Sequence, residues 1–254
     1  MEEHRSCGLA RGSAACFAVI VIPVSSFQIP HFEVTIESLI HVLIRNDPRK
    51  ENRNFIRCFI LKTHSIFLQK KPFILCIQET KLPVVDAFVC RSIWGDDKVD
   101  FSYQRSAGAS GGLVTLWDLN EVEVWSTASL DHVLAVTGRF LKFGEQFTVF
   151  NVYALCDTSR QQVRWNALSS RIAALAGQNV CVCGDFYAIR SAAERRSVSG
   201  ALHQASIDNF NGFVVNNNLV DLPLRGRTYT WYRGDGRTMS RIDRFLLSDN
   251  WCLT

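Results

Sequence analysis

Three acidic residues and one tyrosine lie at or near the ends of apolar runs, where a buried strand would reach the edge of a sheet. Glu79 ends the run FILCIQE, Asp185 ends NVCVCGD, Asp243 lies in SRIDRFLL, and Tyr153 lies in FNVYAL. Acidic groups that meet at one sheet edge repel one another unless a proton or a cation lies between them. Mg²⁺, or Mn²⁺ in its place, prefers such oxygen ligands and would act as a Lewis acid on a phosphoryl oxygen.

Each of these residues also has an ordinary structural interpretation. Glu79 could be a solvated loop acid, Asp185 a turn residue before an aromatic, and Tyr153 part of the sheet packing. Asp243 follows Arg241 by two positions and precedes Arg244 directly, so it could form a surface ion pair. The residues alone leave these alternatives open.

The composition is that of a globular protein with a sizeable core. The 254 residues are 47% apolar and 20% charged, and the formal charge of +4 is compatible with an anionic partner without requiring one. Nine cysteines at irregular spacings contain no CxxC pair, so we expect free thiols in a reducing compartment, no zinc site and no disulfide framework.

One apolar run, CFAVIVIPV at residues 16–24, has two interpretations. It follows arginines, as a leader peptide does, or it is a buried strand. It is too short to span a bilayer, and no other segment reads as a transmembrane helix. We therefore expect an intracellular protein, in the nucleus if it acts on DNA, that makes no membrane contact.

Hydrophobic periodicity predicts strands and helices in alternation. Helices are expected at residues 44–71, 158–176 and 204–218. The apolar side of the second helix would carry Val163, Leu168, Ile172 and Leu175, and that of the third Ile207, Phe210, Phe213 and Val214. Strands are expected in the runs FILCIQET, GGLVTLWD, VEVWSTAS, HVLAVTGRF, FTVFNVYAL, NVCVCGDF, TYTWYR and SRIDRFLL.

This order predicts an α/β protein in which two packed, mainly antiparallel sheets are flanked by helices. No repeat or low-complexity linker divides the chain. We expect one domain over residues 39–254, preceded by a divergent segment at residues 1–38 that carries no readable motif.

The motifs IQETKL, GGLVTLWD, NVYA, GDFYAIRSAAERR, LVDLPLRGRTYTW and SRIDRFLLSDNW follow one another along the chain. In this order they resemble the endonuclease domains of plant non-LTR (LINE-type) retroelements, which belong to the endonuclease/exonuclease/phosphatase family. The resemblance covers roughly residues 47–251. It implies a four-layered α/β sandwich and Mg²⁺-dependent hydrolysis of a phosphodiester bond, with DNA as the partner.

The resemblance also implies a role for each residue at the strand ends. Glu79 matches a metal-binding glutamate. Asp185 matches an aspartate that helps to position or deprotonate the attacking water at the metal. Tyr153 matches a tyrosine that contacts the phosphate, and Asp243 matches an aspartate that orients a catalytic histidine. Arg195 and Arg196 could contact phosphates, but exposed arginines are common and we assign them no role.

The chain departs from the family pattern in four ways. Tyr187 stands where the family has an asparagine of its catalytic set, and its ring is expected to intrude on the metal or water position. The family's first motif is not found, and its asparagine falls on His41 or Asn46. The chain ends at Thr254, before the family's Ser-Asp-His strand, which we expect to be missing. No histidine follows His203.

These departures leave three functions open. The first is a metal-dependent DNA endonuclease that is impaired by the loss of the asparagine and the histidine. The second is a catalytically dead retroelement remnant that at most binds nucleic acid. The third is a phosphatase of the same fold that acts on a small phosphoester, although the motif order favours the first two. The oligomeric state cannot be predicted from the sequence.

Overall fold

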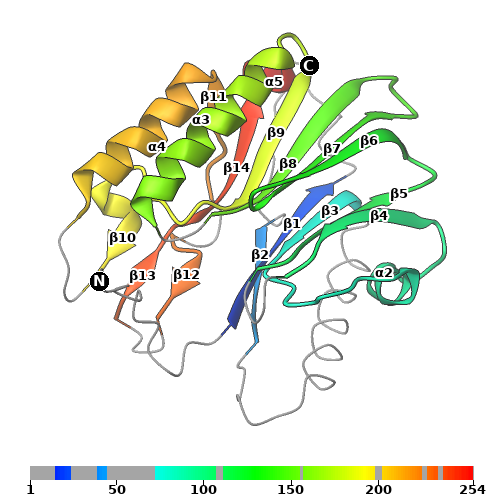
Figure 1. Ribbon diagram of the computed structural model, residues 1–254, viewed down its shortest axis with the longest axis horizontal. Coiled ribbons are helices and arrows are strands. Elements are labelled where there is room, and N and C mark those ends of the chain that lie inside the picture. The colour runs from blue at the N-terminus through cyan, green and yellow to red at the C-terminus, as the bar shows by residue number, and fades with distance from the viewer. Residues whose placement is uncertain are drawn as a thin grey trace, which may run out of the picture.

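Two β-sheets packed face to face form the centre of the protein, and helices cover their outer faces (Figure 1). The computed structural model describes residues 15–23, 39–44, 72–106, 111–154, 157–197, 202–224, 228–233 and 237–253. This is the four-layered α/β arrangement that the sequence predicted.

The first sheet has five strands in the order β2-β1-β3-β5-β4. They are β1 (Ala15–Pro23), β2 (Leu39–Ile44), β3 (Pro72–Gln78), β4 (Val99–Gln104) and β5 (Leu113–Asp118). Every pairing in it is antiparallel. Of the two interpretations of residues 16–24, the structure shows the strand: β1 pairs with β2 on one side and with β3 on the other.

The second sheet has six strands in the order β11-β14-β9-β8-β7-β6. They are β6 (Val122–Leu130), β7 (Val133–Phe140), β8 (Gln146–Tyr153), β9 (Asn179–Asp185), β11 (Leu219–Asp221) and β14 (Asp243–Ser248). Only the β8–β9 pairing is parallel, because the helix α3 (Thr158–Ala174) carries the chain back between these two strands.

A three-stranded sheet lies at one end of the molecule, in the order β10-β13-β12. Its strands are β10 (Arg195–Arg196), β12 (Trp231–Tyr232) and β13 (Met239–Ser240). The short 3₁₀ helix η3 (Ala192–Glu194) leads into β10. The segments TYTWYR and SRIDRFLL, predicted as two β-rich regions, thus supply β12 and β14.

The two large sheets enclose an aromatic core. Phe73 and Trp117 of the five-stranded sheet pack with Phe140 and Phe147 of the six-stranded sheet. The rings of Phe140 and Phe147 lie 4.7 Å apart, centroid to centroid. Strand β3 is buried along its whole length, which explains why its sequence is continuously apolar and not alternating.

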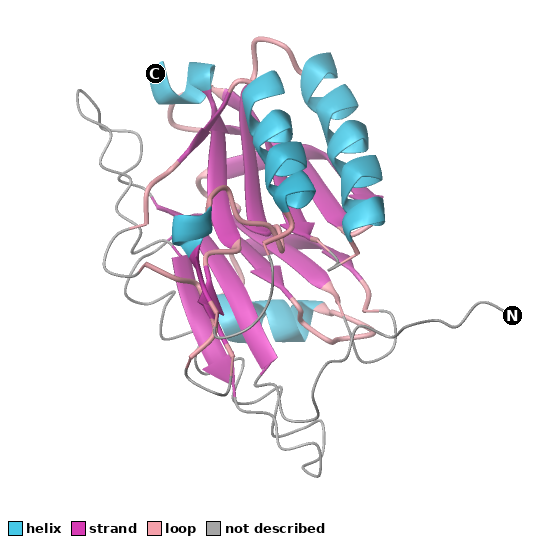
Figure 2. Ribbon diagram, turned by 90° about the vertical axis from the view of Figure 1, so that its left-hand side faces the viewer, coloured by secondary structure: helices cyan, strands magenta, loops and turns pink. Residues whose placement is uncertain are grey.

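Helices α3 and α4 (Gln204–Asn216) lie side by side on the outer face of the six-stranded sheet, as Figure 2 shows. Trp165 of α3 stacks on Phe213 of α4, with ring centroids 5.1 Å apart. The predicted apolar side of α4 is confirmed, since all four of its residues are buried. That of α3 is partly wrong: Val163 is 70% exposed, and Trp165 lies in the core in its place.

Several elements were not predicted, among them β2, α2 (Ala87–Trp94), β4, β11 and α5 (Asp249–Leu253). Helix α2 lies against β4 on the outer side of the five-stranded sheet (Figure 1). The helix predicted at residues 44–71 falls outside the described residues, apart from Ile44, which ends β2. No described helix has both the length and the apolar character needed to cross a membrane.

Candidate active site

Tyr153, Asp185 and Asp243 form one row across three neighbouring strands. Tyr153 is the last residue of β8 and lies opposite Asp185, the last residue of β9. Asp185 in turn lies opposite Asp243, the first residue of β14. Segments that are far apart in the sequence therefore meet at one end of the six-stranded sheet.

Gly184 allows β9 to approach β8 closely just before Asp185. Its φ of +134° lies outside the range that other residues adopt easily, and a Cβ atom there would lie 2.0 Å from the carbonyl oxygen of Val152. Only glycine fits this position. Beyond it, the Asp185 carbonyl accepts a hydrogen bond from the Ala154 N–H at 2.7 Å, which keeps the ends of the two strands together.

Glu79 reaches the same row from the opposite sheet. It directly follows β3 and accepts a hydrogen bond from the Tyr153 hydroxyl, with 2.5 Å between Oη and Oε1. Its φ is +55°, and the turn that carries it is held by a hydrogen bond of 3.1 Å from the Thr80 N–H to the Gly112 carbonyl. Gly112 is required here, because a Cβ would lie 2.4 Å from the Thr80 Oγ1.

Asn151 links the two sheets directly behind this contact, and the sequence analysis did not single it out. Its Oδ1 accepts a hydrogen bond of 2.5 Å from the Gln78 side chain. Its Nδ2 donates to the carbonyls of Ile77 and Val114 at 3.3 and 3.1 Å. Because Gln78 and Asn151 each lie close to a site residue, this buried amide sets the position of Glu79 relative to Tyr153. An asparagine inside the otherwise apolar run FTVFNVY was the available signal.

Burial and neighbouring negative charge raise the proton affinity of two acids at this edge, Asp185 and Glu79. Burial raises the pKa of Asp185 well above its usual range, and the charges of Asp243 and Glu79 add to it, against a hydrogen bond from the Tyr187 N–H. Burial also raises the pKa of Glu79, and Asp243 adds to it, while Tyr153 and Lys81 oppose it. The three carboxylates are therefore near enough to interact, as the sequence predicted.

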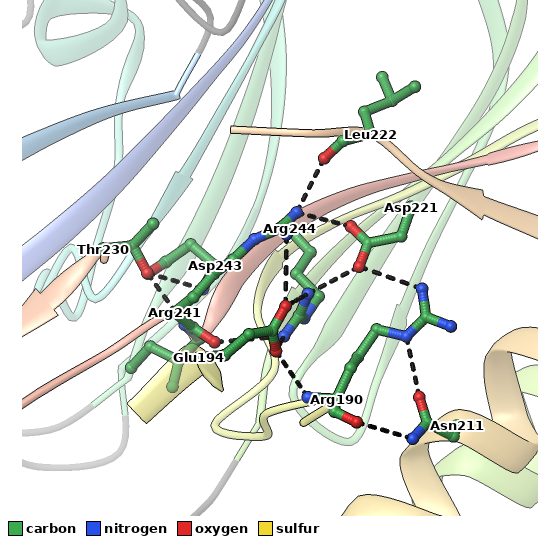
Figure 3. A network of polar contacts seen from close by, with 10 residues as sticks. Arg190, Glu194, Asn211, Asp221, Leu222, Thr230, Arg241, Asp243 and Arg244 are labelled. Atoms are coloured by element: carbon green, nitrogen blue, oxygen red, sulfur yellow. Dashed lines mark hydrogen bonds and ion pairs between the residues drawn. The ribbon is translucent and has the colours of Figure 1, made fainter. Parts of the chain in front are cut away.

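The backbone N–H of Asp243 is hydrogen-bonded, and the arginines on either side of Asp243 in the sequence form ion pairs (Figure 3). The Thr230 hydroxyl oxygen accepts hydrogen bonds from the N–H groups of Ile242 and Asp243 at 2.9 and 3.1 Å. The flanking residues Arg241 and Arg244 both pair with Glu194 and Asp221. Asp243 itself is 1% exposed, so the interpretation of it as a surface ion-pair residue is wrong.

The backbone of Tyr187 contacts the side chain of Asp185, two residues earlier in the chain. Its N–H donates to Asp185 Oδ1 at 2.8 Å, and its φ is +49°. The side chain is 40% exposed. Burial and the neighbouring Glu79 raise the pKa of Tyr153, and Asp185 and Tyr187 add smaller contributions in the same direction. Tyr187 thus lies beside the acids in a backbone conformation that asparagine adopts more easily. That its ring enters the metal or water position remains a prediction.

The remaining predicted positions lie apart from this row or outside the description. His41 lies in β2, opposite Ala18 of β1, and Asn46 falls outside the described residues. Arg195 and Arg196 form β10 and pair with β13. A histidine that was not predicted, His132, lies next to Tyr153, with ring centroids 6.3 Å apart.

The donor atoms at this edge fit a hard divalent cation. All of them are oxygens, from three carboxylates and one phenol. Burial, with neighbouring negative charge added to it, raises the pKa of both Glu79 and Asp185, and a bound cation would favour their charged forms. In the described part of the chain, no three histidine, cysteine or acidic side chains already surround a common point. Mg²⁺ does not require such a cage, since one or two carboxylates and several waters usually hold it.

One comparison with known proteins identifies a family. The sequence profile of the endonuclease/exonuclease/phosphatase family matches residues 56–254. No curated protein sequence matches the chain.

Several solved structures share its fold. The AP endonuclease LMAP from Leishmania major has a TM-score of 0.61 at 18% identity, over 78% of this chain and 76% of that one. The endonuclease domain of TRAS1, a telomere-specific non-LTR retrotransposon, has a TM-score of 0.54 at 16% identity, over 74% and 79%. The human Nocturnin catalytic domain has a TM-score of 0.53 at 16% identity, over 80% and 77%.

Proposed function

The chain belongs to the endonuclease/exonuclease/phosphatase family, and we propose that it hydrolyses phosphodiester bonds in DNA with the help of a divalent metal ion. One observation carries this proposal: Glu79 of one sheet hydrogen-bonds Tyr153 of the other, in a row that continues through Asp185 to Asp243. The order of the six motifs favours an endonuclease of the retroelement type. The TRAS1 domain and LMAP, both endonucleases by name, support this choice.

We assign each residue a task, and Asp185 has two. Glu79 and Asp185 would hold Mg²⁺ or Mn²⁺, which supplies Lewis-acid stabilisation of charge on a phosphoryl oxygen. Asp185 orients the attacking water and accepts its proton. Tyr153 donates a hydrogen bond to a non-bridging phosphate oxygen, once the substrate competes for the hydroxyl that now bonds Glu79. Asp243 adds negative charge beside Asp185, and this increases the tendency of Asp185 to take a proton.

Nicking of supercoiled plasmid tests the proposal. With Mg²⁺ or Mn²⁺ in excess, we expect the wild-type chain to convert supercoiled plasmid to the open circle. Asp185→Asn and Glu79→Gln should each slow this conversion by at least about 10²-fold, the usual contribution of one positioned acid or base. Glu123→Gln is the matched control, because Glu123 is exposed and lies at the opposite end of the six-stranded sheet, paired with Arg139.

Equal nicking by the wild type and by all three variants would assign the cleavage to a contaminant and reject the proposed catalysis. Plasmid hydrolysis that requires Glu79 but not Asp185 would reject the role of Asp185 alone. Phosphate release from a small phosphoester without nicking would support the phosphatase alternative.

A second candidate function is nucleic-acid binding without cleavage. Tyr187 favours it, because the family's asparagine would supply both a donor and an acceptor, whereas tyrosine offers one hydroxyl on a bulky ring. The same protein samples distinguish the two functions. A salt-dependent shift of DNA mobility with no metal-dependent nicking would establish binding alone.

A further inference from the structure

A cavity of about 590 Å³ lies between the edges of the two sheets, near the acidic row. On the side of the five-stranded sheet it is lined by Tyr103 and Gln104 of β4 and by Arg105, which follows them. On the side of the six-stranded sheet it is lined by Ser129 of β6 and by His132 of the β6–β7 turn. The Gln104 side chain donates to the Ser129 hydroxyl at 3.0 Å and so joins the two walls. Its volume is in the range of ordinary small-molecule sites.

Two contacts place this cavity next to the candidate active site. Gly112, on its wall, accepts a hydrogen bond from Thr80, the residue that follows Glu79. His132, on the opposite wall, accepts through its carbonyl a hydrogen bond of 3.0 Å from the N–H of Tyr153. One wall is therefore bonded directly to Tyr153, and the other is bonded to the residue next to Glu79.

The lining combines a cation, an aromatic ring and neutral polar groups. Arg105 is exposed and Tyr103 is partly exposed. The acid on the wall, Asp131, is already paired with Arg164 at 3.3 Å and with His132 at 3.5 Å. An exposed guanidinium suits a phosphate, an aromatic ring suits the face of a base, and the amide and hydroxyl suit its polar edge.

We propose that this cavity is a subsite for the nucleotide adjacent to the scissile phosphate, with Arg105 binding the next phosphate along the strand. Tyr103 and His132 contact the base or sugar between the two phosphates. The subsite rests on the proposed function, because it assumes that the substrate of the adjacent active site is a polynucleotide and not a small phosphoester. It identifies the substrate as a strand that extends past the cleavage point on the side of β4 and β6.

The experiment has a binding arm and a kinetic arm. In the binding arm, a fluorescein-labelled single-stranded DNA 12-mer is titrated in EDTA at several salt concentrations. Arg105→Gln should weaken binding and reduce the slope of log Kd against log salt by roughly 0.7, the value for one phosphate contact on a single strand. His132→Asn should weaken binding by about fivefold with little change in slope, because it removes an uncharged contact.

The variants are chosen so that folding is preserved. Arg105 is exposed, and asparagine tolerates the φ of +56° found at His132. Arg139→Gln is the charge-matched control, since it lies seven residues from His132 along β7, roughly 23 Å away at the rise of an extended strand. Its Kd and salt slope should equal those of the wild type. An unchanged slope in Arg105→Gln, or an equal reduction in Arg139→Gln, would overturn the subsite.

The kinetic arm separates this inference from the proposed function. Bis(p-nitrophenyl) phosphate has no nucleotide to place in the cavity, whereas the 12-mer does. For Arg105→Gln and His132→Asn, the loss of kcat/KM on the 12-mer should exceed the loss on the small diester by about tenfold, because only the 12-mer loses contacts to a flanking group. Equal losses on both substrates would overturn the subsite. If the wild type cleaves neither substrate, the proposed function fails, and the binding arm still decides the subsite.

Discussion

Tyr187 has two unfavourable features at one position. Its backbone lies in the left-handed region, with a φ of +49°, which costs a tyrosine roughly 1 kcal/mol more than an asparagine or glycine. Its side chain also replaces an amide where the family resemblance implies one. The left-handed conformation is retained because it allows the Tyr187 N–H to donate a hydrogen bond to Asp185 Oδ1.

Replacing Tyr187 with asparagine should therefore improve both stability and activity. We expect Tyr187→Asn to raise Tm by about 2–4 °C, the shift that corresponds to roughly 1 kcal/mol in a protein of this size. We also expect faster plasmid nicking, by at least about tenfold, because a positioned amide is restored beside Asp185. Differential scanning calorimetry and the nicking assay measure the two effects.

Tyr187→Gly separates the two effects. Glycine accepts the left-handed backbone but supplies no amide, so it should lose the bulky ring without gaining activity to the level of Tyr187→Asn. Equal nicking by the glycine and asparagine variants would show that the ring alone limits the wild-type enzyme. A Tm of Tyr187→Asn below that of the wild type would contradict the strain argument.

The acids of the site could be predicted from the sequence because each lies at one end of an apolar run: Glu79 and Asp185 follow their runs, and Asp243 lies just before one. A carboxylate that follows several buried residues marks a strand end, and strand ends of packed sheets meet. Asn151 was missed because it lies inside an apolar run, where a single polar residue does not indicate a strand end or a functional site. Its bonds to Ile77 and Val114 depend on the other sheet, which no local pattern reveals.

The strand β14 is anchored by the buried ion-pair network of Figure 3. Arg244, which is 1% exposed, donates to both Glu194 and Asp221. Burial alone would raise the pKa of Glu194, but the hydrogen bond and charge of Arg244 outweigh it, so this pKa lies below its ordinary value. The network joins η3, β11 and β14 next to Asp243, and so it helps to fix the position of that carboxylate.

Arg244→Met should destabilise the protein strongly, because it removes a fully buried cation that pairs with both Glu194 and Asp221. We expect a loss of about 3–5 kcal/mol in the free energy of unfolding, the range for breaking a buried ion pair by removing one partner. Urea denaturation monitored by circular dichroism measures this loss. The matched substitution Arg139→Met removes an exposed pair with Glu123 and should cost less than about 1 kcal/mol.

A similar loss in both variants would show that burial of the network adds nothing beyond a surface ion pair.

Long periodic elements could be predicted, and short ones could not. Helices α3 and α4 have 17 and 13 residues, enough turns for an apolar side to repeat. Helix α2 has eight residues and depends on its ends: the Asp86 carboxylate accepts from the Val89 N–H at 2.9 Å, and Gly95 ends it with a φ of 98°. Strand β4 is partly exposed along most of its length and has no clear alternation.

The two large sheets must lie at a fixed distance from each other, because the candidate site combines Glu79 of one sheet with Tyr153 of the other. The aromatic core between them sets this spacing, and the contacts of Asn151 and Tyr153 across the gap refine it. The α/β sandwich was predicted because the order of strands and helices follows from local patterns. The pairing order of the strands, including the placement of β1 between β2 and β3, is a long-range property that those patterns do not contain.

We expect Glu79 of one sheet and Asp185 of the other to hold a single divalent ion between them. Isothermal titration of the metal-free protein with Mn²⁺ tests it most directly. We predict one saturable site in the wild type and in Glu123→Gln, and at least about tenfold weaker binding in Glu79→Gln and in Asp185→Asn, a loss typical for a metal-site residue. The same Mn²⁺ affinity in all four proteins would contradict the claim.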